Sequence, residues 1–231
     1  MKRRSVAQLA VVVIVVFAMG LVIGRDWAKP SSSTTSAPTT NVTTTTLASQ
    51  PVSAIWPFAS TPTRFATPEL AAQTFALDYL GFTNPVMEPF QQGDTRSGEV
   101  PVRSSAMGPT TTILVRQVTS DDSWWVIGAV SANILLRTPT ALQAIPNPVL
   151  LKGTSTAYEA VVNVQIRQDA SLVPLARTTV MGGSMGVMGP FTKKITYSTP
   201  TASGGAIMMY TLSAKDGSVL EASVLRVTFA K

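Results

Sequence analysis

The chain has 231 residues, of which 45% are hydrophobic and only 13% charged, and its formal net charge is +6. It contains no cysteine and no histidine, which excludes disulfide frameworks, cysteine nucleophiles, imidazole bases and zinc sites built from these residues. Five basic residues and one acidic residue lie in the first 30 positions, leaving thirteen basic and eleven acidic residues for the remainder. The remainder lacks the basic stripe that nucleic-acid binding requires, so we expect no nucleic-acid partner, metal or cofactor.

Residues 1–29 predict a cytoplasmic tip followed by a transmembrane anchor. The nineteen residues 6–24 contain Gln8 as the only strongly polar side chain, and as a helix they would span about 28 Å, enough for the hydrocarbon core of a bilayer. Basic residues in Met1–Arg4 favour a cytoplasmic N-terminus and place the rest outside the plasma membrane. The alternative is a signal peptide cleaved near Ala18–Gly20, but the apolar run continues past that point and favours an uncleaved single-pass anchor.

Residues 30–63 predict a stalk between the membrane and the folded part. Runs such as Ser31–Thr35 and Thr43–Thr46, with scattered prolines and almost no charge, cannot bury enough apolar surface to offset chain entropy. We therefore expect disorder here. The apolar stretch Ile55–Phe58 is the exception, and we expect it to dock on the following domain.

Residues 64–139 predict a small α+β domain with one helix on an antiparallel sheet. Thr67 suits the N-cap, Pro68 the first helical position and Gly81 the C-terminal stop. Beyond the helix the hydrophobic pattern changes to period two. The strands expected in this part are Gly98–Ser104, Thr110–Val118, Trp124–Val130 and Ala132–Arg137.

Residues 140–231 show no helical pattern and predict an all-β immunoglobulin-like sandwich. Val162, Val164 and Ile166 alternate with polar residues, as in a half-buried strand. Short strands separated by turns about every dozen residues are typical of such sandwiches. The expected strands are Val149–Gly153, Tyr158–Arg167, Leu175–Val180, Phe191–Tyr197, Ala206–Ser213 and Val219–Phe229.

Several short motifs in residues 144–230 resemble the immunoglobulin-like domain of bacterial sporulation and spore germination proteins. They are Pro146-Asn147-Pro148 before Val149–Gly153, Tyr158-Glu159-Ala160, Gly189-Pro190-Phe191, and Ser213–Ser218. The resemblance implies a domain outside the membrane with a binding or assembly role, and it carries over no catalytic residue.

Residues Gly182–Gly186 match G-x-S-x-G, the pattern of a serine hydrolase nucleophile elbow. The chain has no histidine to act as the base, and Lys193 and Lys194, the only alternative, lie on an expected strand. The segment after Gly186 leads into a strand and not a helix. We therefore interpret the motif as a glycine-rich loop and expect no enzymatic activity.

The same loop is the strongest candidate for a contact surface, through Met181, Met185, Val187 and Met188. Glycines give the loop conformational freedom, and methionine side chains adapt to varied apolar partners. The alternative is that these side chains fold back on the edge of the sandwich.

Trp125 is the second candidate contact. It is adjacent to Trp124 on an expected strand, so the two side chains should lie on opposite faces. An exposed tryptophan could stack on a sugar of the cell wall, whereas the alternative is that both are covered by the helix or by the other domain.

Together these observations favour a noncatalytic bacterial envelope protein, held at the membrane by residues 6–24, that acts as an adaptor for another envelope protein. The alternative function is a module that binds a cell-wall polymer or a lipid, with a cavity between the helix and the sheet of the first domain.

Overall fold

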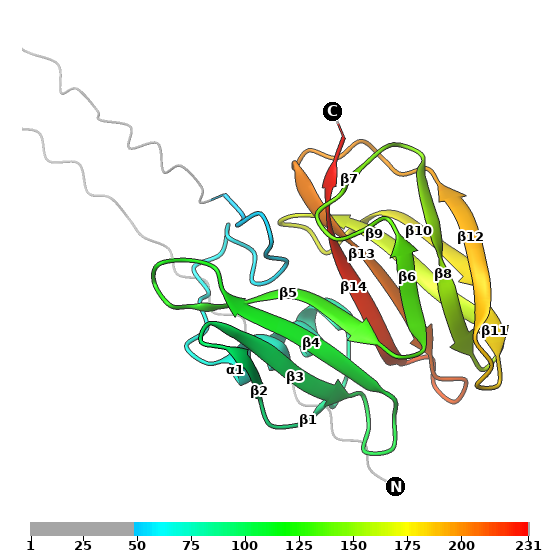
Figure 1. The fold of residues 1–231 in the computed structure, drawn as a ribbon, viewed down its shortest axis with the longest axis horizontal. Coiled ribbons are helices and arrows are strands. Elements are labelled where there is room, and N and C mark those ends of the chain that lie inside the picture. Colours follow the sequence, from blue (N-terminus) through cyan, green and yellow to red (C-terminus); the bar gives the residue numbers. More distant parts are fainter. Residues whose placement is uncertain (1–48, 231) are drawn as a thin grey trace, which may run out of the picture. The chain divides into compact units, whose positions relative to one another are not determined.

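The computed structural model describes residues 49–230. The predicted anchor at residues 6–24 and the stalk up to residue 48 lie outside the described residues. Within residues 49–230, no helix is both long enough and apolar enough to cross a membrane. This part of the chain is mostly antiparallel β-sheet with one short helical segment (Figure 1).

The helical segment occupies the predicted residues but changes its winding midway. Helix α1 (Pro68–Thr74) is α-helical, and η1 (Phe75–Leu80) continues it as a π-helix. The Thr67 hydroxyl accepts a hydrogen bond from the backbone N–H of Leu70 at 3.3 Å, which confirms the predicted N-cap. Gly81, at φ 82°, ends the segment in the left-handed conformation that glycine adopts without strain.

The first sheet packs under this helix. Its three long strands run antiparallel in the order β3, β4, β5, and the two short strands β1 and β2 both pair with β3. The predicted strands of this part are present with small shifts at their ends. Their bounds are Val86–Met87 for β1, Gln91–Asp94 for β2, Ser97–Arg103 for β3, Thr110–Gln117 for β4 and Trp124–Ser131 for β5.

The remaining strands form a sandwich of the predicted kind. One sheet has the order β14, β13, β9, β10, and the opposing sheet has the order β6, β8, β12. All six strands predicted after residue 140 are present, although the second begins at Val161 because Tyr158–Ala160 forms a turn with Ala160 at φ 61°. The bounds are Ile134–Thr138 (β6), Ala144–Ile145 (β7), Val149–Ala157 (β8), Val161–Gln168 (β9), Pro174–Met181 (β10), Gly183–Ser184 (β11), Gly189–Ile195 (β12), Gly204–Leu212 (β13) and Val219–Phe229 (β14).

Strand β6 belongs mainly to the sandwich. The sequence alone predicts it as part of the first domain, residues 64–139. It pairs with β5 at one position, Ser131 with Ile134, and with β8 at four positions. Periodicity identifies a strand but not the neighbour that completes its hydrogen bonds. The predicted division between domains at residues 139 and 140 stays a prediction.

Residues 49–63, which the sequence assigned to the end of the stalk, fold against β5. Backbone hydrogen bonds join Ile55 N–H to the Val126 carbonyl and Val126 N–H to the Trp56 carbonyl, both at 2.8 Å. The predicted docking of Ile55–Phe58 is therefore confirmed, and order extends back to the start of the described residues. Burial of Ala54 and Ala59 against Trp125 gives this segment its apolar contacts.

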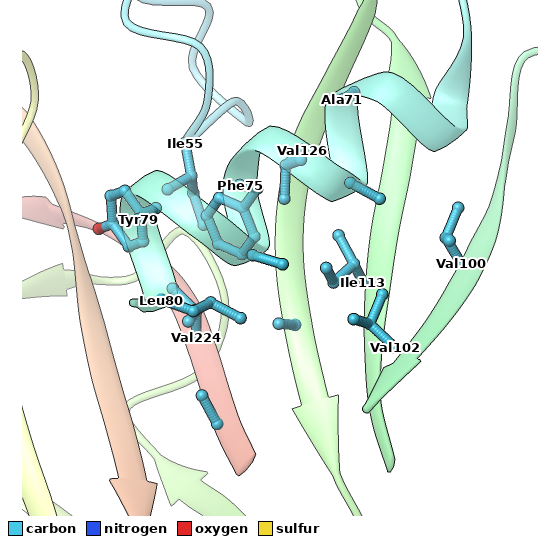
Figure 2. Close-up of a cluster of buried hydrophobic side chains, with 14 of the residues drawn as sticks. Ile55, Ala71, Phe75, Tyr79, Leu80, Val100, Val102, Ile113, Val126 and Val224 are labelled. Carbon is cyan, nitrogen blue, oxygen red and sulfur yellow. The ribbon is translucent and has the colours of Figure 1, made fainter. Parts of the chain in front are cut away.

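Two hydrophobic cores lie on opposite faces of β13. Ile207 and Met209 enter the core between the two sheets of the sandwich, whereas Ala206 and Met208 join the core under the helix. Figure 2 shows the second core, in which Leu80 of the helix lies beside Val224 of β14. The helical segment therefore covers the first sheet and the outer face of the sandwich together.

Two buried arginines reinforce this junction. The guanidinium of Arg167 donates to the Tyr79 carbonyl at 2.8 Å, at the C-terminal end of η1, and lies 4.7 Å from the centre of the Tyr79 ring. Arg226 forms an ion pair with Asp169 and donates from Nε to the Val52 carbonyl at 2.8 Å. Side chains of β9 and β14 thus hold the helix and the N-terminal segment in place.

Tyr79 makes this junction sensitive to alkaline pH. Burial raises the pKa of Tyr79 to about 12, against the opposing charges of Arg167 and Arg226. In the unfolded chain the phenol of Tyr79 has its ordinary pKa near 10. Its contribution to the free energy of unfolding is therefore fully present below pH 10 and is lost as the pH rises from 10 to 12. We expect a loss of about 2–3 kcal/mol across this interval in urea titrations. Tyr79→Phe should reduce this dependence of the unfolding free energy on pH. If the variant loses as much stability as the parent chain between pH 10 and 12, Tyr79 is not the responsible group.

Candidate functional site

Three loops meet at one end of the sandwich and surround a cavity of about 530 Å³. The first is the turn between β8 and β9, the second joins β10 to β12 through β11, and the third is the hairpin between β13 and β14 (Figure 1). Residues 157–159, Val161, Met185, Gly186 and several hairpin residues line the cavity. We call this end of the sandwich, with its cavity and the exposed side chains of residues 181–188, the loop-end surface.

The connection between β10 and β12 is tightly built. Met185 and Gly186 adopt left-handed backbone conformations, with φ of 53° and 82°. The Gly186 N–H donates to the Thr156 hydroxyl at 3.1 Å, and the Gly182 N–H donates to the Ala160 carbonyl at 3.1 Å. These bonds fix the connection to the end of β8 and to the neighbouring turn.

Gly183 allows this path because no side chain would fit there. A Cβ at Gly183 would lie 1.9 Å from the Val187 carbonyl oxygen and 2.5 Å from the Gly189 nitrogen. We expect Gly183→Ala to force the connection apart and to cost about 1–3 kcal/mol of unfolding free energy in urea denaturation. Gly93→Ala is the matched control, because the nearest atom to its Cβ is 3.6 Å away. Equal stabilities of the two variants would contradict this prediction.

The predicted contact residues of the loop are exposed. The accessible fractions are 66% for Met181, 75% for Met185, 70% for Val187 and 38% for Met188. Tyr158, on the neighbouring turn, is 70% exposed and lines the same cavity. Met185 and Tyr158 thus line one cavity, although Tyr158 was not among the predicted contact residues. Contact of these side chains with a partner stays a prediction.

Trp125, the fifth predicted contact residue, is buried with only 1% of its surface accessible. Its indole N–H donates to the Thr119 and Ser123 hydroxyls, both at 3.1 Å, and the Arg64 guanidinium lies over its ring. Residues 49–63 cover this face of β5, which removes Trp125 from the contact surface. Trp124 points to the other face and packs edge-on against Phe90. Both side chains are therefore covered, but Trp125 is covered by residues 49–63 and not, as the alternative interpretation expected, by the helix or the other domain.

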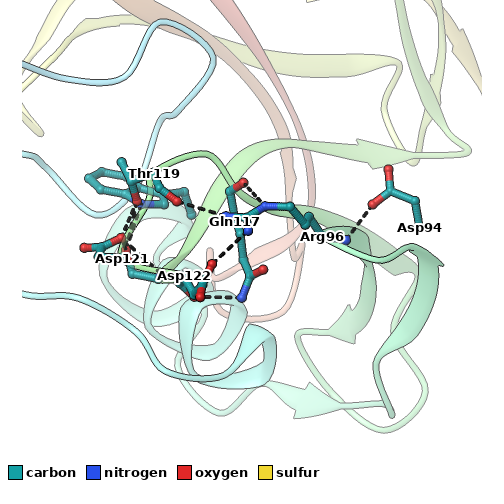
Figure 3. Close-up of polar contacts among 8 residues, drawn as sticks. Asp94, Arg96, Gln117, Thr119, Asp121 and Asp122 are labelled. Carbon is teal, nitrogen blue, oxygen red and sulfur yellow. Dashed lines mark hydrogen bonds and ion pairs between the residues drawn. The ribbon is translucent and has the colours of Figure 1, made fainter.

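The turn that follows β4 holds Trp125 in this position. The side chain of Asp121 accepts hydrogen bonds from Thr119 and Ser123, as Figure 3 shows, and these bonds lower the pKa of Asp121 to about 2. Arg96 pairs with Asp122 at 2.8 Å and also donates to the Thr119 carbonyl at 2.9 Å. The acidic residues of this turn therefore serve local hydrogen bonding, and across residues 49–230 no group of three such side chains could hold a metal ion.

The floor of the cavity contains a buried carboxylate, Glu221, which is 4% exposed. The Ser131 hydroxyl donates to it, and the Asn133 amide donates to both of its oxygens at 3.2 and 3.3 Å. Thr211, directly opposite on β13, donates at 3.4 Å. Glu221 was not among the residues predicted from the sequence, although a glutamate inside the largely apolar strand Val219–Phe229 was a visible signal.

Ser184 of the G-x-S-x-G match lies in the short strand β11, and the chain then turns into β12. The local geometry is a strand–turn–strand connection, unlike the strand–turn–helix of a nucleophile elbow. Between the helix and the first sheet, where the alternative function placed a lipid cavity, Ala71, Phe75 and Ala76 are completely buried in a packed core.

Comparison with known proteins identifies the sandwich but not the rest of the chain. No curated protein and no solved structure is significantly similar to this chain. One family model, described as the immunoglobulin-like domain of bacterial spore germination, matches residues 133–218. The match covers β6 to the hairpin before β14, including residues 181–188 but not Glu221, and it confirms the resemblance seen in the sequence motifs. Residues 133–218 therefore match the immunoglobulin-like domain of bacterial spore germination.

Proposed function

We propose that this protein is a noncatalytic adaptor of the bacterial cell envelope that binds another envelope protein through its loop-end surface. The observation that carries the proposal is the exposure of Met181, Met185, Val187 and Tyr158, each at least 66% accessible, of which Met185 and Tyr158 line one cavity. Several large exposed apolar side chains at one end of a domain are typical of protein interaction sites. Methionines also suit a surface that must adapt to its partner.

The family match indicates the biological process in which this adaptor would act. The matched domain belongs to bacterial spore germination proteins, which suggests a germination-related role. The apolar residues 6–24 support a tether in the plasma membrane, and the intervening Ser/Thr-rich residues support a spacer. The domain would then be presented outside the membrane.

Photocrosslinking in intact cells tests the adaptor. A photoreactive residue at Met185 should give a discrete protein adduct whose mass identifies the partner. The control position is Val173, which is exposed to the same extent, 75%, but lies in the turn at the far end of β9. Adducts of equal yield from both positions, or none from Met185 with the chain at its normal level, would refute the proposal.

Replacing Met185 and Met188 together by serine tests whether the apolar side chains carry the binding. Partner recovery should fall by about tenfold or more, because two apolar side chains leave the interface. The melting temperature should stay within about 2 °C, since exposed substitutions change stability little. Val173→Ser is the matched control and should leave recovery unchanged. A large drop in melting temperature for the double variant would mean that these side chains belong to the core.

A further inference from the structure

The cavity of the loop-end surface carries a charge that the chain does not neutralise. Glu221 accepts hydrogen bonds from Ser131, Asn133 and Thr211, all of which are neutral donors. Among residues 49–230 there are three ion pairs, and Glu221 takes part in none of them. Burial of a carboxylate without a cation is costly, and such groups are usually paired.

The lining of the cavity favours a positively charged occupant. Of the described residues that line it, none is lysine or arginine, and Glu159 adds a second carboxylate. Lys215 lies in the same hairpin but outside the lining. At about 530 Å³ the cavity is within the usual range of ligand sites and can admit a long side chain.

The side chains at the rim of the cavity can contact the remaining atoms of a cationic side chain. Tyr158 offers an exposed ring, which attracts ammonium and guanidinium groups, and Met185 and Leu212 offer apolar surface for an alkyl chain. A small free amine that reached Glu221 would leave these rim side chains uncovered. A lysine or arginine side chain on a polypeptide would cover them with its neighbouring residues.

We propose that the cavity above Glu221 receives a lysine or arginine side chain of the partner protein. This inference rests on the proposed adaptor function and names the chemistry by which the loop-end surface recognises its partner. Glu221 would form the ion pair, with Ser131 and Asn133 holding its carboxylate toward the cavity. Binding at this point would be specific for a cationic residue because a neutral one would leave Glu221 unpaired.

Titration of the full-length chain with model compounds, followed by NMR, tests the cation site independently of any partner. The probes are the acetylated and amidated tripeptides Gly-Lys-Gly and Gly-Arg-Gly, with Gly-Gln-Gly as the neutral peptide and n-butylammonium as the free amine. We expect saturable shifts at the amides of Gly186 and Gly217 with at least one cationic peptide, and binding at least about tenfold weaker for the neutral peptide. Equal shifts with the neutral peptide, or none with either cationic peptide, would overturn the proposal.

Two variants connect the shifts to the cavity. Glu221→Gln keeps an acceptor for Ser131 but removes the charge, and it should weaken cationic peptide binding about tenfold or more. Ala214→Trp fills the exposed mouth without touching Glu221 and should have a similar effect, so a folding defect in the first variant would not hide the result. Glu69→Gln, on the first turn of α1, is the control and should bind like the parent chain. Unchanged binding in Ala214→Trp would overturn the proposal.

The results with n-butylammonium and with the crosslink at Met185 distinguish a free amine from a partner side chain as the ligand. They also distinguish failure of the cation site from failure of the adaptor proposal. If n-butylammonium binds at least about tenfold more tightly than both cationic peptides, a small amine is the ligand and the partner side chain is excluded. Peptide binding combined with no crosslink at Met185 would refute the adaptor while the cation site stands. A crosslinked partner combined with no peptide binding would leave the adaptor and refute the cation site.

Discussion

Asp169→Asn should destabilise the protein by about 3 kcal/mol, measured as a decrease in the free energy of unfolding in urea. The substitution keeps the shape of the side chain but removes the charge that faces Arg226, whose side chain is only 4% exposed. Arg226 also donates to the carbonyls of Val52 and Gly205, so it cannot turn toward solvent without breaking those bonds. A buried guanidinium without its counterion accounts for the expected cost.

Asp122→Asn is the matched control for this substitution. Asp122 also pairs with an arginine, Arg96, but the two side chains are 68% and 44% exposed. Exposed pairs contribute about 0–1 kcal/mol because water screens them, and asparagine tolerates the positive φ of 55° at this position. A similar loss in the two variants would mean that burial of the Arg226 pair has no special effect on stability.

Phe75→Ala should have the largest effect among single core substitutions, a loss of about 3–5 kcal/mol of unfolding free energy. Phe75 is completely buried at the start of η1 and stacks on Tyr79, with ring centres 4.8 Å apart. It packs into the core that joins the helix to both the first sheet and the outer face of the sandwich. The cavity left by its removal would therefore weaken both contacts at once.

Leu77→Ala is the control on the same helical segment. Leu77 is 39% exposed, and its substitution should cost less than about 1 kcal/mol because little buried area is lost. If Phe75→Ala cost no more than this control, the helix would not be fixed to the sheets through the core that Figure 2 shows.

Local sequence signals predicted most of the secondary structure because each depends on neighbours in the chain. Thr67, Pro68 and Gly81 fixed the ends of the helical segment through capping and backbone preference. The period-two pattern located the long strands, with errors at ends such as Tyr158–Ala160, where a turn replaces the strand. The change to π-helical winding after Thr74 left no such local signal.

The sequence did not reveal which polar residues are buried. Gln165 and Arg167 alternate with core residues on β9 and were expected on an outward face, yet both are buried beneath the end of the helix. A sandwich strand alternates in the same way whether its outer face meets water or another element. The covering helix lies some eighty residues earlier in the chain, so no local pattern could report it.

In the candidate site, too, features set by local sequence were predicted and features set by distant contacts were not. Four of its exposed side chains were proposed as contacts from the composition of residues 181–188, since glycine and methionine describe a loop wherever it lies, and their contact with a partner stays a prediction. Trp125 was misplaced because residues 49–63 cover its face of β5, and Glu221 was missed because its donors come from other strands and from the turn after β5. Both depend on segments distant in sequence.

The sequence by itself determined the local conformations, the immunoglobulin-like pattern of the C-terminal part and the loop rich in glycine and methionine, because capping, alternation and loop composition act over a few residues. Only the tertiary structure decided that the helix covers two sheets, that Trp125 is buried, and that a carboxylate faces the cavity beside that loop. These features depend on contacts between strands and loops far apart in the chain, and burial and pairing exist only once those contacts form.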